Sequence, residues 1–228
     1  ETLISYLIFI KENVERDSSL VNMDELANVA IVMTNQGEKN PKKDNIHFTP
    51  LYGNKYDLMQ KFPGYNWCLL DGVYIQNLSN SLDKQRWHRF FSKLGVTDFI
   101  TVRPTSIELN SETVKDSAWE ALAQLHPDDF KEGCVIEDYS CDELRDLLKE
   151  NKTPQTYEAQ MKSLVGILDQ VWDSDFSRFT RTKLTRKDNK QEREVDASFS
   201  IWLKTLEWLP AIKASVSFEK NNIVKYRE

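Results

Sequence analysis

Seven basic side chains crowd into a short stretch of the second half of the chain, between aromatic and threonine residues. They are Arg178, Arg181, Lys183, Arg186, Lys187, Lys190 and Arg193. Cations beside rings such as Phe176 and Phe179 are typical of surfaces that hold a nucleic-acid backbone and stack a base. Acidic residues, among them Asp188 and Glu192, lie in the same stretch, and mixed charge is also typical of a solvated ribbon. The sequence leaves open a nucleic-acid contact, a partner contact or a ribbon without either.

Other kinds of functional site find little support in the residue types. The seven glycines are not arranged as a Walker loop or a dinucleotide-binding loop, whose backbone must approach phosphate closely. Cys134 and Cys141 have no second pair beside them, and the three histidines are scattered, so no metal site is predicted. Carboxylate pairs such as Asp128 and Asp129 are common at helix ends, and no G-x-S-x-G motif occurs. We therefore expect no catalytic residue, no cofactor, no metal ion and no enzymatic activity.

The basic stretch is predicted to be a β-hairpin. Residues 176–198 alternate polar with apolar positions and are rich in threonine, and Asp188 with Asn189 gives a turn signal in the middle. We expect a polar hairpin that projects from the neighbouring helices.

A second cluster of reactive residue types lies in "RWHRFFSKLGVTDFI", residues 86–100. Four apolar side chains fall at i, i+3, i+4 and i+7, on one face of a helix: Trp87, Phe90, Phe91 and Leu94. Asp83 is the expected N-cap, Gly95 the expected left-handed C-cap, and residues 96–102 the expected strand. His88 lies off the apolar face, so we expect it to be exposed at least in part and to have no chemical role.

The remaining segments predict an α+β fold, in which helices pack with short, mostly antiparallel strands and hairpins. Expected helices cover residues 2–15, 111–126, about 141–149, 153–172 and 199–209, and expected strands include 29–33, 46–49 and two short pieces after Pro210. We expect one compact unit over residues 1–228, cut from a larger protein and helix-rich in its second half. A division into two lobes, about 1–133 and 134–228, is the alternative.

Composition limits the class of protein. Hydrophobic residues make up 40% and charged residues 29% of the 228 positions, which is typical of a folded globular chain. A net charge of −6 argues against general adhesion to nucleic acid or anionic membrane. Three cysteines are too few for a secreted disulfide framework, and the longest apolar run, "TLISYLIFI", is well short of the roughly 20 residues of a membrane span. We expect an intracellular protein in a reducing compartment, with no membrane contact.

Several segments, taken in order and approximate spacing, resemble the NO VEIN-like proteins. These are "NIHFTPLYGN", "RWHRFFSKLGVTDFITV", "DYSCDELRDLLKE", "LVGILDQVWDSDFS" and "SFSIWLKTLEWLPA", with "LGVTDFI" and "LDQVWD" the most specific. The resemblance spans most of residues 25–212. It implies a large, sacsin-like parent with an ATPase domain of the Hsp90 and histidine-kinase type near its N-terminus, and a nuclear location. This chain resembles a portion of the region after that ATPase and has none of the ATPase's Asn-box or Gly-box motifs.

Two functional hypotheses follow. The first is a non-catalytic scaffold or interaction segment, whose partners are other domains of the same parent chain or an unknown protein. The second is a nucleic-acid-contacting module that uses the basic hairpin. A nuclear or cytoplasmic location fits both.

Overall fold

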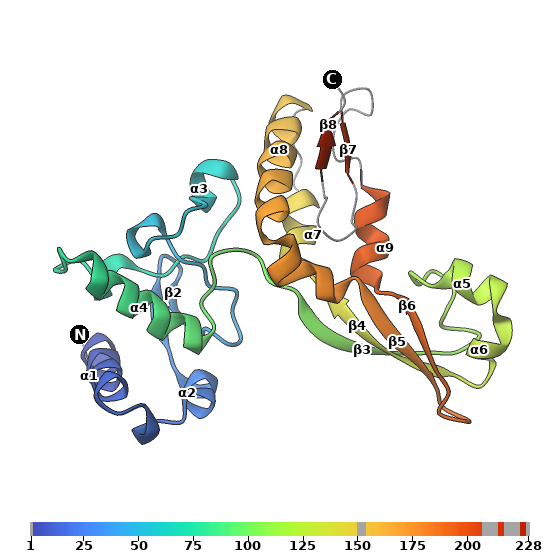
Figure 1. Cartoon of the computed structure of the whole chain (residues 1–228), viewed down its shortest axis with the longest axis horizontal. Coiled ribbons are helices and arrows are strands. Elements are labelled where there is room, and N and C mark those ends of the chain that lie inside the picture. The colour runs from blue at the N-terminus through green and yellow to red at the C-terminus, as the bar shows by residue number, and fades with distance from the viewer. Residues whose placement is uncertain (1, 150–153, 207–213, 217–223, 227–228) are drawn as a thin grey trace. The chain divides into compact units, whose positions relative to one another are not determined.

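A computed structural model describes residues 2–149, 154–206, 214–216 and 224–226 of the chain. The chain forms two compact units, Glu1–Ile100 and Thr101–Glu228 (Figure 1). Helices are combined with small antiparallel sheets, which confirms the predicted α+β class. The unit boundary differs from the division near residue 133 suggested by the sequence. It precedes β3 (Arg103–Leu109), which pairs along its whole length with β4 (Cys134–Ser140), so both strands belong to one sheet.

The first unit contains four α-helices and one short hairpin among its described residues. The helices are α1 (Thr2–Arg16), α2 (Met23–Val29), α3 (Leu58–Lys61) and α4 (Ser81–Leu94), and the strands are β1 (Val32–Thr34) and β2 (Gly37–Lys39). The segment 46–49 was predicted to pair as a strand, but its residue His47 makes only isolated bridges, to Leu69 and Thr97. The strand β1 instead pairs with β2, which lies between the two segments predicted as strands.

The helix α4 shows the predicted apolar face. Trp87, Phe90, Phe91 and Leu94 are all buried, and they share a core with Leu7 and other α1 side chains. The N-cap is Asn80, whose side chain accepts a hydrogen bond from the Leu82 N–H at 2.9 Å, so the prediction of Asp83 as the cap was wrong. The prediction of Gly95 as the C-cap is confirmed, with a φ of 111°.

The segment 96–102 does not form the predicted strand. Its burial pattern is not an alternation, because Val96, Phe99 and Ile100 are all buried. Thr97 bonds to both neighbours of His47: its N–H donates to Ile46 O at 3.0 Å, and its carbonyl accepts from Phe48 N at 2.9 Å. Among the described residues this pairing is a single isolated bridge and not a ladder.

The second unit is built on a four-stranded antiparallel sheet of order β3-β4-β5-β6, with β5 (Arg181–Arg186) and β6 (Glu192–Asp196). The helices are α5 (Glu120–Leu125), α6 (Pro127–Lys131), α7 (Asp142–Lys149), α8 (Pro154–Val171) and α9 (Ser198–Thr205). A separate pair, β7 (Ala214–Val216) and β8 (Val224–Tyr226), confirms the two short extended pieces predicted near the end. Pro104 lies within β3 and does not break it, since an edge strand tolerates a missing backbone N–H.

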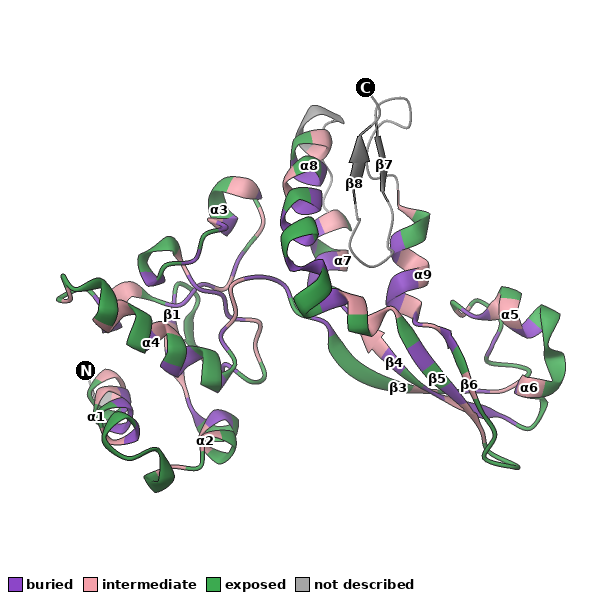
Figure 2. Cartoon of the chain, in the orientation of Figure 1, coloured by how far each residue is buried: buried purple, intermediate pink, exposed green. Residues whose placement is uncertain are grey.

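The long helix α8 confirms its prediction, and buried and exposed residues alternate along it (Figure 2). The predicted helix over 111–126 is shorter and begins at Glu120. The reason is local: the Asn110 side chain accepts hydrogen bonds from the backbone N–H groups of Glu112 and Thr113, and Asp116 has a φ of 64°. The Asn110 contacts are those of a helix N-cap, but the left-handed backbone at Asp116 stops the helix after its first turn. The predicted end of the last helix, near Pro210, lies outside the described residues.

Candidate functional site

Six of the seven basic residues lie on the hairpin of β5 and β6, which is shorter than the predicted range 176–198. Arg178 lies outside it, in the 3₁₀ helix Ser177–Phe179 that precedes β5. The register pairs Arg181 with Asp196 and Lys183 with Glu194. The Asn189 side chain, which accepts from Gln191 N at 2.9 Å, stabilises the turn, in which Lys190 adopts a left-handed φ of 59°. The hairpin is not free-standing, because β5 also pairs with β4.

The two faces of the hairpin have different roles. Thr182, Leu184 and Val195 are buried, and Leu184 and Val195 belong to the apolar cluster of the second unit. Successive side chains of a strand point to opposite faces, so Arg181 and Lys183 are exposed on the other side. The core therefore fixes the register that presents the cations.

Five of the seven predicted site residues contact a carboxylate. The Arg181 Nε lies 3.1 Å from Glu194 Oε1, and its Nη1 bonds to Asp196. The Lys183 Nζ lies 2.8 Å from Glu192 Oε2. The hydrogen bonds that the two cations donate to these carboxylates are the main cause that raises the pKa of both Arg181 and Lys183. The cations are thus neutralised across the strand pair.

The other three pairs reach beyond the two strands or close the turn. Arg186 makes a two-pronged contact with Asp188, with Nη2 at 2.6 Å and Nε at 3.0 Å from the carboxylate oxygens. Lys187 is paired with Glu108 of β3. Arg193 lies 3.1 Å from Asp129 and 3.0 Å from the His126 ring, at the junction of α5 and α6. The partners in the last two pairs are far apart in the sequence, so the sequence alone did not predict these pairs.

Two site residues, Arg178 and Lys190, have no ion pair within the described part of the chain. The Arg178 guanidinium lies 4.6 Å from the centroid of the Phe179 ring, which in turn packs against Tyr139 at 4.9 Å. Phe176, predicted as a ring that could stack a base, is buried and stacks on Trp172. The aromatic part of the predicted site is therefore reduced to Phe179.

A shallow depression of about 480 Å³ lies over the exposed face of this sheet. Its charged lining consists of three cations and three carboxylates: Arg181, Lys183, Arg193, Glu137, Glu192 and Glu194. The charges cancel formally, so the depression offers no net attraction to a polyanion.

The structure also brings together a serine, a histidine and an aspartate that the sequence did not connect. The His88 Nε2 lies 3.0 Å from Asp98 Oδ1, and Ser92 Oγ lies 3.5 Å from His88 Nδ1. Ser92 and His88 are one helical turn apart, and the Gly95 stop turns the chain so that Asp98 faces the ring. The i, i+4 spacing was the only signal present in the sequence.

This Ser92–His88–Asp98 arrangement does not have the geometry of a nucleophilic triad. The Ser92 hydroxyl donates to the His88 backbone carbonyl at 2.9 Å, a tighter contact than the one to the ring. The residues lie at the C-terminal end of α4, where carbonyl groups rather than N–H groups are unpaired, so the end of the helix offers no oxyanion donors. The side chain of His88 is 29% exposed, which confirms the prediction of partial exposure.

Metal-binding residue types occur in the described part of the chain but do not cluster. No group of three or more His, Cys, Asp or Glu side chains there could hold a metal ion, and the three cysteines are not joined in disulfides. No helix in the described part of the chain is both long and apolar enough to span a bilayer.

Comparison with known proteins gives one informative similarity. The chain is 24% identical over 220 residues to Protein NO VEIN of Arabidopsis thaliana, in an alignment that covers 88% of this chain. This similarity supports assignment to a NO VEIN-like family and confirms the resemblance predicted from the motifs. The chain spans about 8% of the length of that relative. No family model matches the chain, and no solved structure matches it.

Proposed function

We propose that this NO VEIN-like chain is a non-catalytic interaction segment of a large protein and that its basic hairpin does not contact nucleic acid. The proposal against nucleic-acid contact rests on the ion pairs that neutralise most cations of the hairpin. Arg181, Lys183, Arg186, Lys187 and Arg193 are each in contact with a carboxylate.

Neutralised cations are poor phosphate ligands. Affinity for nucleic acid comes mainly from Lys and Arg side chains that replace the counterions of the phosphate backbone. A phosphate bound at any of these five cations would first have to displace a carboxylate. The net charge of −6 adds a general repulsion of polyanions.

An exposed aromatic pair supports an interaction role. The helix α1 buries Leu7, Ile10 and Val14 but leaves Tyr6 59% and Phe9 64% exposed. The two exposed rings are three residues apart, and they therefore lie on the same side of the helix. Aromatic side chains that stay in water are enriched at protein interfaces. We assign this pair to contact with another domain of the parent protein.

In this proposal the parent has the sacsin-like organisation that the family resemblance implies. ATP binding and hydrolysis belong to a different part of that protein, and this chain supplies a folded contact surface. A scaffold role and a nuclear or cytoplasmic location remain predictions of the same proposal.

The interaction role is tested by co-purification with the remaining domains of the protein. The chain and its double variant Tyr6→Asp/Phe9→Asp are each expressed with those domains, and the double variant should lose the contact. The matched control is Leu125→Asp, because Leu125 is a single apolar residue of the second unit that is 76% exposed. Equal recovery of all three proteins would contradict a role for α1.

The choice against nucleic acid is tested on the isolated chain. Binding to single-stranded RNA and DNA is measured at 50 and 200 mM salt, with the triple reversal Arg181→Glu/Lys183→Glu/Lys187→Glu as the comparison. We expect no salt-dependent complex with either protein and no ATP turnover. A complex that weakens steeply with salt and disappears in the triple variant would favour the nucleic-acid alternative.

A further inference from the structure

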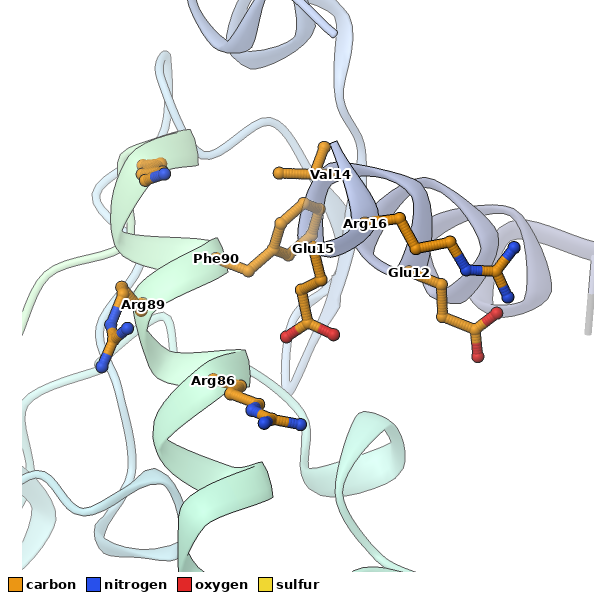
Figure 3. Close-up of a pocket in the computed structure, with 8 residues that line it drawn as sticks. Glu12, Val14, Glu15, Arg16, Arg86, Arg89 and Phe90 are labelled. Carbon is orange, nitrogen blue, oxygen red and sulfur yellow. The ribbon is translucent and has the colours of Figure 1, made fainter. Parts of the chain in front are cut away.

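The first unit contains a groove that differs in charge balance from the hairpin. It has a volume of about 510 Å³ and lies between the C-terminal turns of α1 and the exposed side of α4. Val14 and Phe90 meet between the two helices, and charged side chains project from both (Figure 3). The groove therefore has an apolar floor and charged walls.

Cations are in excess in this groove. Its lining includes four cations, Arg16, Arg86, Arg89 and Lys93, and two carboxylates, Glu12 and Glu15. Glu15 is already bound to Lys11 at 2.8 Å, and Arg86 makes only a long 3.5 Å contact with Asp83. Arg16, Arg89 and Lys93 have no ion pair within the residues that the structure describes. These free cations contrast with the paired cations of the hairpin.

The cations of α4 form a line. Arg86, Arg89 and Lys93 are spaced i, i+3 and i+7, which places them on one face of the helix over about 10 Å at 1.5 Å per residue. Cations in the last turn of a helix also stabilise its dipole, and this accounts for Lys93 and for Arg16 in α1. It does not account for Arg86 and Arg89, which precede the last turn of α4.

The dimensions and walls of the groove favour one kind of ligand. A line of three cations over about 10 Å fits carboxylates on successive turns of a partner helix, where side chains also recur at i, i+3 and i+7. Arginine binds carboxylates in a two-pronged geometry. Glu12 lies exposed in the opposite wall and would repel a continuous polyphosphate chain.

We propose that the groove between α1 and α4 docks an acidic helical segment of a partner protein through Arg86, Arg89 and Lys93. The inference rests on the proposed interaction function and names the chemistry of one partner. Glu12 weakens the contact and restricts it to ligands of low charge density.

The test uses the full chain and two fluorescent peptides. One is a helical peptide with glutamates at i, i+3 and i+7 on one face, and the other has the same composition with the glutamates distributed around the helix. We expect the first peptide to bind in fluorescence anisotropy, at least tenfold more weakly after Arg89→Glu/Lys93→Glu, and more tightly after Glu12→Gln. The charge-matched control Arg181→Glu/Lys183→Glu should change the affinity less than twofold.

The outcomes separate this inference from the proposed function. Equal binding of both peptides, or equal losses in the groove and control variants, would show only non-specific attraction and overturn the inference. Tighter binding of a single-stranded oligonucleotide of the same charge at this groove would overturn it as well. If the peptide does not bind but the chain still co-purifies with its neighbouring domains, the groove assignment fails and the interaction function stands.

Discussion

The imidazole of His88 stacks on the ring of Phe48, with 4.0 Å between ring centroids and 19° between ring planes. The same imidazole is hydrogen-bonded to Asp98 at 3.0 Å. A residue on the polar side of α4 thus joins two segments that flank the helix in the fold. These contacts connect α4 to both segments, and the core residues of the same helix should contribute more to stability.

The first prediction compares these two kinds of contact. Phe91 is fully buried, so Phe91→Ala should leave a cavity and reduce the free energy of unfolding by about 3–5 kcal/mol. His88→Ala should cost about 1–2 kcal/mol, because it removes one ring contact and one partly exposed hydrogen bond. Urea denaturation followed by tryptophan fluorescence measures both. A His88 variant as unstable as the Phe91 variant would contradict this assignment.

The second prediction concerns the helix stop at Gly95. Its φ is 111°, and an added Cβ would lie 2.9 Å from the Pro41 carbonyl oxygen, which is backbone and cannot rotate away. Gly95→Ala should therefore cost more than about 2 kcal/mol.

Gly53 provides the matched control, because its φ of 92° is also left-handed but an added Cβ would meet nothing within 4 Å. Gly53→Ala should cost only the backbone strain, about 1 kcal/mol. The same unfolding experiment compares both variants, and equal losses would rule out the clash with Pro41.

The third prediction concerns thiol reactivity. Burial raises the pKa of Cys134 to about 11 and that of Cys141 to about 12, so very little thiolate forms at pH 8. Cys68 is only partly buried. The native protein should react quickly with a thiol reagent at one position, and two more thiols should become reactive in denaturant. Cys68→Ser should abolish the fast phase, whereas a fast phase that remains would place a second thiol in contact with solvent.

The fourth prediction gives the pH dependence of one ion pair. Partial burial raises the pKa of Asp196, but bonds from Lys204, at 2.8 Å, and from Arg181 outweigh burial, and the net pKa is below 3.8. Since the folded-state pKa is lower than the unfolded one, the pair stabilises the fold above pH 3.8. This contribution is lost as the pH falls through the folded-state pKa.

The variant Asp196→Asn should be less stable than the wild type by about 1 kcal/mol or less at pH 6, and the difference should vanish in acid. Lys204→Gln removes one partner and should raise the pKa of Asp196. Unfolding curves between pH 2 and pH 7 measure both effects. A difference that is independent of pH would contradict the ion-pair explanation.

The sequence by itself determined the elements whose signals are local. The apolar spacing of α4, the left-handed stop at Gly95, the long helix α8 and the turn at Asp188 could all be read from residues within a few positions of one another. Helical periodicity and turn chemistry act over such short distances, and burial of the repeated face then stabilises the element. The family resemblance was also fixed by short motifs in order.

Only the tertiary structure determined which charged side chains form ion pairs and which strands pair. Lys187 contacts Glu108 and Arg193 contacts Asp129, across separations that no local pattern encodes, and these contacts convert a basic stretch into a neutral surface. Two further contacts, the pairing of β3 with β4 and the bond between His88 and Asp98, likewise depend on the path of the chain between the two partners. Arg89 and Lys93 of α4 stay unpaired because the fold brings no carboxylate of the described residues within ion-pair distance of them. The charge of a side chain follows from the sequence, but whether that charge can bind a ligand depends on the neighbours that folding brings to it.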